Sequence, residues 1–292
     1  MHFASPVVRP PYEAGSAYLQ VTRGCSHDGC LFCTYYKNTP FSVSPEREVA
    51  EDLDELARSG IPVSRIWLQG ADPFLLSYDR LMRIADLIRQ KLPQVGSIGG
   101  YGRVDSLRNK SPEQLSKLRG AGYSGIVFGV ESGDDEVLAL MNKGYRSEEI
   151  ARQLEKMDEA GLDYAVIYLC GLAGKGNGLR NARRTAAVFN RIRPSRILIS
   201  SLTIFEDTPL RKKILEGGFK EEGEVERIRE IQELLRLLEN PALIDARNAS
   251  AMIPLYGAIP GQKEEMLTAL DSVASLLGEN ALRRMRSSLA AI

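Results

Sequence analysis

The feature that most constrains the fold is a regular alternation of short β-rich runs with segments of helical periodicity. Six runs are rich in β-branched, aromatic and aliphatic residues, and they occupy residues 17–22, 63–69, 97–101, 125–130, 164–169 and 196–201. Repeated strand–helix–strand units build parallel sheets of the α/β class. Because six units fill roughly residues 16–215, they favour an open, partial (β/α)6 TIM-like barrel over a complete eight-stranded one.

Several of the intervening helices have clear start and stop signals. The tripeptide Ser-Pro-Glu occurs at residues 44–46 and again at 111–113. In each copy the serine suits the N-cap, the proline suits the first helical position and the glutamate faces the positive helix end. We predict that these two helices end at Gly60 and Gly120, and that a third helix spans residues 147–161.

The chain beyond the sixth unit is expected to form a mainly helical extension that packs on the barrel. Residues 216–240 are acidic and carry apolar side chains at helical spacing, a pattern typical of core packing. This stripe consists of Val225, Ile228, Ile231, Leu235 and Leu238. Residues 241–262 predict a loop, and one or two helices follow. We therefore expect an N-terminal extension at 1–15, the barrel at 16–215 and the helical extension at 216–292.

Charge and composition argue against several classes of protein. The 38 basic side chains balance 38 acidic ones, so no positive excess is present for unspecific nucleic-acid binding. No apolar run approaches the roughly 20 residues that cross a bilayer, and the first residues do not resemble an export signal, so we expect a cytoplasmic protein without a membrane segment. His2 and His27 are the only histidines, which disfavours Ser-His-Asp hydrolases and His-rich metal sites.

Three of the four cysteines are crowded together after the first predicted strand. Cys25, Cys30 and Cys33 lie within nine residues, in a Cys-x4-Cys-x2-Cys pattern. Cys170 stands alone and is expected to be a buried small hydrophobe. Thiols in a reducing compartment ligate metals rather than form disulfides. Three thiolates can hold three irons of a [4Fe-4S] cluster and leave the fourth iron open to bind and activate a molecule.

This loop resembles the cluster-binding loop of the radical S-adenosylmethionine (SAM) superfamily. The resemblance includes the aromatic Phe32 immediately before the third cysteine, although the first gap is one residue longer than the commonest Cys-x3-Cys-x2-Cys spacing. It implies an enzyme in which a [4Fe-4S] cluster on Cys25, Cys30 and Cys33 reductively cleaves SAM. The 5′-deoxyadenosyl radical then abstracts hydrogen from a small organic substrate, and a flavodoxin or ferredoxin supplies the electron.

Segments after the later strands resemble the SAM-binding motifs of the same superfamily. Residues 69–73 (Gln-Gly-Ala-Asp-Pro) resemble the Gly-Gly-Glu motif that receives the SAM ammonium, and residues 129–133 resemble a Gly-x-Glu-Ser segment near the ribose and carboxylate. Residues 169–176 resemble a glycine-containing strip beside the adenine. The resemblance predicts SAM contacts at Phe32, Gly70, Ala71, Asp72, Arg103, Glu131, Ser132, Leu169 and Gly171.

Local structural roles are open for some of these residues. Arg103 suits the SAM carboxylate and equally suits an ion pair with Glu131. Ser132 or Asp134 suits the N-cap of the next helix, a role that is compatible with SAM binding. Within the superfamily the chain looks closest to a branch of short proteins. These proteins are often labelled by analogy with oxygen-independent coproporphyrinogen oxidase or with methylthiotransferases. However, Tyr35 stands where the oxidase has a further cysteine.

Two other functions stay open at this point. An iron–sulfur electron-transfer or cluster-carrier protein would hold the cluster without turning over SAM. A zinc-stabilised binding module would need His27 as a ligand, and only one residue separates His27 from Cys25, which strains a tetrahedral site.

A C-terminal segment is a candidate for substrate contact. Residues 247–262 resemble an ending found in the same branch, and they suit either a lid or a structural strap. As a lid, the segment would contact substrate through Arg247, Asn248, Ser250 or Tyr256.

Overall fold

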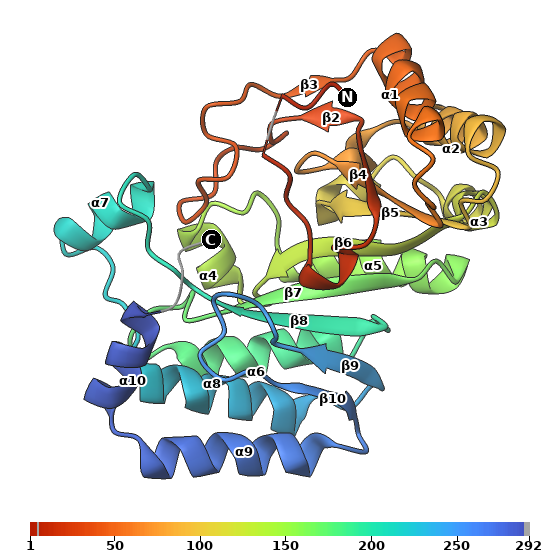
Figure 1. Cartoon of the computed structure of the whole chain (residues 1–292). Coiled ribbons are helices and arrows are strands. Elements are labelled where there is room, and N and C mark those ends of the chain that lie inside the picture. Colours follow the sequence, from red (N-terminus) through yellow and green to blue (C-terminus); the bar gives the residue numbers. More distant parts are fainter. Residues whose placement is uncertain (5, 289–292) are drawn as a thin grey trace. The chain divides into compact units, whose positions relative to one another are not determined.

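Parallel strands alternate with helices along most of the chain, as the sequence predicts (Figure 1). The computed structural model describes residues 1–4 and 6–288. These residues divide into two compact units. Unit 1 comprises residues 1–28, 35–129 and 153–165, and unit 2 comprises residues 29–34, 130–152 and the chain from Val166 onward.

Unit 1 contains parallel strands in the order β1-β4-β5-β6 and a short antiparallel ribbon, β2–β3. Its strands are β1 (Ala17–Gln20), β2 (Thr22–Arg23), β3 (Ser42–Val43), β4 (Arg65–Gln69), β5 (Ser97–Gly102) and most of β6 (Tyr123–Glu131). Its helices are α1 (Glu46–Arg58), α2 (Tyr78–Lys91) and α3 (Pro112–Gly120). Leu19, Trp67 and Phe128 are fully buried, as expected for a parallel sheet that is covered on both faces.

Unit 2 contains strands in the order β7-β8-β9-β10, in which β8 and β9 are parallel and β10 is antiparallel to β9. These strands are β7 (Tyr164–Cys170), β8 (Arg196–Ser201), β9 (Ala242–Asp245) and β10 (Tyr256–Ile259). The helices are α4 (Asp135–Leu140), α6 (Gly178–Phe189), α7 (Pro209–Leu215), α8 (Glu224–Leu237), α9 (Lys263–Leu276) and α10 (Glu279–Ser287). Figure 1 shows α6 and α8 side by side below the strands, with α9 beyond α8. Helix α5 (Ser147–Ala160) and β7 contribute residues to both units.

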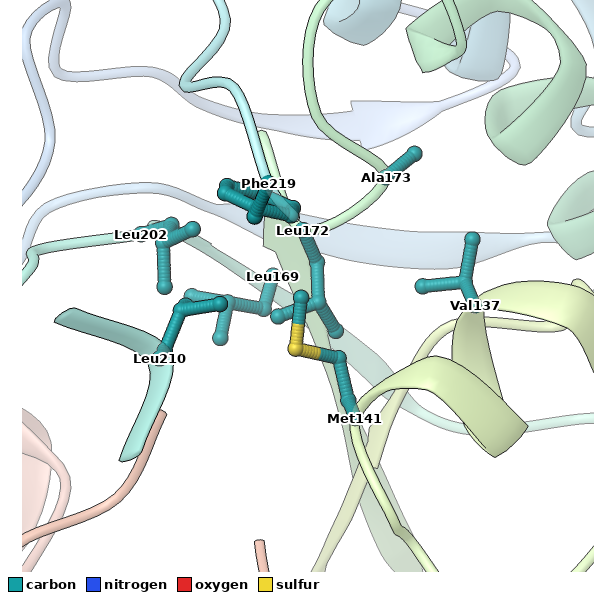
Figure 2. Packing of buried hydrophobic residues seen from close by; sticks show 8 residues of the cluster. All are labelled: Val137, Met141, Leu169, Leu172, Ala173, Leu202, Leu210 and Phe219. Carbon is teal, nitrogen blue, oxygen red and sulfur yellow. The ribbon is translucent and has the colours of Figure 1, made fainter. Parts of the chain in front are cut away.

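A hydrophobic cluster in unit 2 joins α4 to the ends of β7 and β8 (Figure 2). It consists of Val137, Met141, Leu169, Leu172, Ala173, Leu202, Leu210 and Phe219. Leu31 and Phe32 of the cysteine loop pack against this cluster. The cluster therefore anchors the part of the loop that carries Cys30 and Cys33.

The six predicted strands are confirmed, with ends that shift by one or two residues in most cases. The predicted cap at residue 111 is also confirmed, because Ser111 and Gln114 form a reciprocal capping box at the start of α3. The predicted cap at Ser44 is wrong. Pro45 occupies the N-cap of α1 without a side-chain hydrogen bond. The backbone N–H of Ser44 instead donates to the carbonyl oxygen of Val21, which holds this serine outside the helix.

The prediction of a loop over residues 241–262 is also wrong, because β9 and β10 lie there. Each strand has only four residues, which is too short for periodicity to indicate in a single sequence. The helical C-terminal part is present as α8, α9 and α10. The division of the chain at residues 15 and 215 stays a prediction. Among the residues that the structure describes, no helix has the length and apolar character needed to span a membrane.

Candidate active site

The first cysteine of the loop lies in unit 1, in a turn stabilised by local hydrogen bonds. The backbone N–H of Asp28 donates to Sγ of Cys25 at 3.4 Å, and Asp28 has a left-handed φ of 42°. Nζ of Lys37 donates to the carbonyl oxygen of Asp28 at 2.8 Å. Gly24, which directly precedes Cys25, has a left-handed φ of 66°. A Cβ at this position would lie 2.2 Å from the carbonyl oxygen of Thr39. The turn therefore requires glycine at this position and leaves Cys25 partly exposed.

The other two cysteines lie in unit 2, in a segment fixed by backbone hydrogen bonds. The N–H of Cys33 donates to the carbonyl oxygen of Cys30 at 3.4 Å, which closes a tight turn. Between them, the N–H of Leu31 donates to the carbonyl of Met141, and the carbonyl of Leu31 accepts from the N–H of Leu210. Cys30 is buried and Cys33 is partly exposed.

The donor set of the loop fits an iron–sulfur cluster. All four cysteines lie among the described residues, and none of them forms a disulfide. Cys25, Cys30 and Cys33 present three soft sulfur donors close together in the sequence, the ligand type that iron–sulfur clusters require.

Asp72, which follows β4 in unit 1, is fully buried and accepts three hydrogen bonds. Its Oδ2 accepts from the hydroxyls of Ser26 at 2.9 Å and Ser106 at 2.5 Å, and its Oδ1 accepts from the N–H of Arg103 at 3.0 Å. Burial raises the pKa of Asp72, and these hydrogen bonds oppose the rise. Because Ser26 is next to Cys25, Asp72 connects the first cysteine to the segments that follow β4 and β5.

The other predicted SAM contacts of unit 1 also have local partners. Gly70 has φ 121°, and a Cβ there would lie 2.0 Å from Oγ1 of Thr22, so the backbone approaches β2 closely. The N–H of Ala71 donates to the carbonyl oxygen of Gly24 at 3.3 Å. Arg103 forms a two-pronged ion pair with Asp105, at 3.0 and 3.2 Å, a partner that the sequence did not suggest.

In unit 2, Glu131 and Ser132 lie where β6 ends. Glu131 has a left-handed φ of 69° and lies 3.8 Å from Nζ of Lys143. Burial raises the pKa of Glu131, and the Lys143 charge opposes the rise. The hydroxyl of Ser132 donates to Oδ1 of Asn181 at 2.5 Å. Asp134 caps α4 by accepting from the N–H of Glu136, which confirms the capping role predicted for this segment.

The two residues predicted to contact the adenine, Leu169 and Gly171, lie at the end of β7. Leu169 is part of the hydrophobic cluster in Figure 2. Gly171 has φ 84°, and its N–H donates to Oε2 of Glu230 at 2.7 Å. Cys170 between them is fully buried, as predicted, but its sulfur lies 3.0 Å from the same carboxylate oxygen.

Hydrogen bonds in the C-terminal segment support the strap interpretation of residues 247–262. Nδ2 of Asn248 donates to the carbonyl of Ile199 at 2.8 Å, and Oγ of Ser250 accepts from the N–H of Ser201 at 3.0 Å. Both bonds connect the segment to β8. Arg247 lies 3.5 Å from the ring centroid of Tyr256, so these two exposed side chains stack on each other.

Sequence reasoning missed the polar groups that are buried around Cys170. Glu230 lies on α8, and its carboxylate accepts from Tyr168, Asn181, Gly171 and Cys170. The acidic composition of residues 216–240 suggests a solvated helix face, so nothing in the pattern distinguishes the buried glutamate from the exposed ones.

Taken together, the alternating fold and the thiol loop define an α/β protein with soft donors for a metal cluster after its first parallel strand. A family model described as "Radical SAM superfamily" matches residues 19–178, which is more than half of the chain. The chain belongs to this superfamily. Enzymes of this superfamily use a [4Fe-4S] cluster and SAM.

The chain is also similar to individual known proteins. The heme chaperone HemW of Bacillus subtilis (strain 168) is 24% identical over 166 residues, which are 55% of this chain and 43% of the relative. The anaerobilin synthase of Escherichia coli O157:H7 is 24% identical over 212 residues, which are 68% of this chain and 46% of the relative. The chain thus spans less than half the length of these two relatives.

Solved structures support the fold. The radical SAM methyltransferase TsrM of Kitasatospora setae, solved with cobalamin and a [4Fe-4S] cluster, superimposes with a TM-score of 0.56 at 20% identity. The match covers 69% of this chain and 39% of that one. The comparisons therefore confirm the predicted α/β class, a radical SAM fold with a helical C-terminal part.

Proposed function

We propose that Cys25, Cys30 and Cys33 bind the [4Fe-4S] cluster, and that the enzyme generates a 5′-deoxyadenosyl radical that abstracts hydrogen from a small organic substrate. The observation that carries this proposal is the set of three cysteines within nine residues, none of them in a disulfide, on a loop inside the family match. When bound and reduced, the cluster supplies the electron that cleaves the sulfur–carbon bond of SAM.

The chain contributes fixed positions for its sulfur donors. The turn at Asp28 and the Asp72–Ser26 hydrogen bond hold the segment around Cys25. In unit 2, the backbone bonds of Leu31 hold the segment between Cys30 and Cys33. Donors that are positioned before the metal arrives lose less conformational entropy on binding.

We propose that the residues predicted from the sequence to contact SAM do so, because they lie at the ends of successive strands. Gly70, Ala71 and Asp72 follow β4, Arg103 follows β5, and Glu131 and Ser132 lie at the end of β6. Leu169 and Gly171 lie at the end of β7, and Phe32 precedes the third cysteine. Ligands of βα enzymes bind at these carboxyl ends of strands. The set offers carboxylates for an ammonium and a guanidinium for a carboxylate, the charged groups of SAM.

Exclusion of water is the second contribution of the chain. Leu31 and Phe32 pack against the hydrophobic cluster of unit 2, so apolar side chains flank the second and third cysteines. A radical that attacks most C–H bonds requires such an environment, because selectivity then depends on which substrate carbon is held close.

Cluster chemistry of this kind also bears on the electron donor and on the cellular compartment. Radical SAM enzymes need an external electron donor, and we propose a flavodoxin or a ferredoxin. The crowded thiols favour a reducing, cytoplasmic compartment.

The test is to purify the full chain anaerobically, reconstitute it with iron and sulfide, and add SAM and dithionite. We expect about four irons per chain and formation of 5′-deoxyadenosine. Cys30→Ala should lose both, whereas Thr34→Ala on the same loop should retain both. Cluster absorbance without 5′-deoxyadenosine would support an electron-transfer or carrier protein instead, and zinc without iron would support a zinc module. Full SAM cleavage by Cys30→Ala would refute the ligand assignment.

A further inference from the structure

Three potential metal ligands meet in the interior of unit 2, away from the cysteine loop in the sequence. Cys170 ends β7, Glu222 lies in the loop before α8, and Glu230 lies on α8. One ligand atom from each lies within 4.8 Å of the other two. The three residues are 0%, 2% and 0% exposed, respectively.

Glu230 is surrounded by donors. Its Oε1 accepts from the hydroxyl of Tyr168 at 2.5 Å and from Nδ2 of Asn181 at 2.8 Å. Its Oε2 accepts from the N–H of Gly171 at 2.7 Å and from the thiol of Cys170 at 3.0 Å. Four donors surround this carboxylate, an arrangement that suits an ionised carboxyl group.

Glu222 has the opposite environment. Both of its carboxyl oxygens are buried, and among the described residues neither has a hydrogen-bond partner. Gly178 leaves space for this side chain, because a Cβ there would lie 2.1 Å from Oε1 of Glu222. Burial, together with the neighbouring Glu230 charge, raises the pKa of Glu222 to about 10. A carboxyl group in such a place needs either a proton or a cation.

The buried cation beside the cluster does not balance the full set of acids. Arg227 is 2% exposed, and its guanidinium already pairs with Glu221 at 2.7 Å and with the carbonyl of Leu202 at 3.0 Å. A thiolate and two carboxylates carry three negative charges. One divalent cation would neutralise two of these charges.

We infer that Cys170, Glu222 and Glu230 form a second metal site, which binds one zinc ion. The sulfur ligand argues against Mg²⁺ and Ca²⁺, which take oxygen ligands. Zn²⁺ accepts thiolate at about 2.3 Å and carboxylate at about 2.0–2.2 Å. Ligands in such a tetrahedral site are roughly 3.5 Å apart, so the three atoms reach it with small side-chain movements.

The site would connect three segments of unit 2. Zinc would join the end of β7 to α8 and to the loop before it, close in the sequence to the predicted adenine contact at Gly171. Zinc binding would also displace the protons of Cys170 and Glu222, which burial otherwise retains by raising the pKa of each group.

The experiment measures zinc and iron in the reconstituted full chain by mass spectrometry, after incubation with zinc and removal of loosely bound metal on a chelating resin. We expect about one zinc per chain in addition to the cluster iron. Glu222→Gln, which preserves the shape of the side chain, should lower zinc at least tenfold without changing iron. Glu239→Gln, an exposed glutamate after α8, is the matched control and should retain zinc.

Two further measurements make the result decisive. Cobalt(II) in place of zinc should give a thiolate charge-transfer band that disappears in Cys170→Ser, which tests sulfur ligation even if Glu222→Gln does not fold. Cys30→Ala should lose iron and keep zinc, which separates this site from the cysteine loop. Fewer than about 0.1 zinc per chain, unchanged zinc in Glu222→Gln, or loss of zinc in Cys30→Ala would overturn the inference. Glu222 would then simply be a protonated buried acid.

Discussion

Replacement of Asp72 tests whether one buried carboxylate organises the segment that carries the first cysteine. Asp72→Ala removes the acceptor for Ser26, Ser106 and the N–H of Arg103. Hydrogen bonds to a charged group contribute about 1.5–3 kcal/mol each. The two hydroxyls can rotate toward other acceptors, whereas the backbone N–H cannot. We therefore expect Asp72→Ala to lower the free energy of unfolding by less than the sum of three such bonds, about 3–5 kcal/mol.

Asp72→Asn should lower the free energy of unfolding less than Asp72→Ala does, because its side chain keeps hydrogen-bonding groups. Its amide oxygen can still accept from the N–H of Arg103, and its NH2 group can donate to hydroxyls that rotate to become acceptors. This variant should stay within about 1 kcal/mol of the native protein at neutral pH. Asp86→Ala, which removes an exposed ion pair with Arg89, is the control and should cost less than about 1 kcal/mol.

The stability that Asp72 contributes should change with pH in one direction. Because burial raises the pKa of Asp72 above its ordinary 3.8, the folded protein keeps, between pH 3.8 and the folded pKa, a proton that the unfolded chain has lost. This contribution to stability is complete below pH 3.8 and declines as the pH rises through the folded pKa. The stability of the native protein relative to Asp72→Asn should therefore decrease from acidic toward neutral pH.

The assay is urea unfolding followed by circular dichroism, together with iron content after reconstitution. Asp72→Ala should bind several-fold less iron because Ser26 adjoins Cys25, and Asp72→Asn should bind as much as the native protein. A loss of less than about 1 kcal/mol in the alanine variant, or an equal loss of iron in both variants, would show that Asp72 does not organise this segment.

Two other predictions concern unit 1. Burial lowers the pKa of Lys110 from 10.5 to about 8, so between these pH values the unfolded chain holds a proton that the folded protein lacks. Each pH unit of this range is worth about 1.36 kcal/mol. From pH 8 to 10.5, the free energy of unfolding should therefore rise by roughly 3 kcal/mol relative to that of Lys110→Met. Equal urea midpoints for the two proteins across this range would contradict the predicted rise. Gly70→Ala would place Cβ 2.0 Å from Oγ1 of Thr22, whereas at Gly60, which also has a positive φ, nothing lies within 4 Å. Thermal unfolding should show a loss of more than about 2 kcal/mol for Gly70→Ala and about 1 kcal/mol for Gly60→Ala, and similar losses would show that the close contact is unimportant.

Local sequence signals predicted the regular elements well where the signal was long or chemically specific. The strand at residues 196–201 has the predicted ends, and the cap at Ser111 forms as expected. The identical tripeptide at residues 44–46 does not form the same cap, because the backbone of Ser44 is bonded to Val21. The same local pattern thus had two outcomes, and contacts distant in the sequence decided between them.

The candidate site shows the same division. The motif positions followed from the sequence, but the partners of Asp72 and Arg103 did not. Asp72 meets Ser26 and Ser106, which are 46 and 34 positions away in the chain. Arg103 pairs with Asp105, only two residues away, and sequence spacing alone did not favour this pair over Glu131.

The sequence by itself determined the cysteine loop, because three ligands within nine residues are held close by the covalent chain whatever the rest of the fold does. Only the tertiary structure decided that Glu222 and Glu230 are buried beside Cys170, while Glu216, Glu221 and Glu239 of the same acidic stretch are exposed. Burial and the summed charge of neighbours depend on which segments pack together. A titratable side chain therefore acquires its chemistry from residues that its own stretch of sequence does not contain.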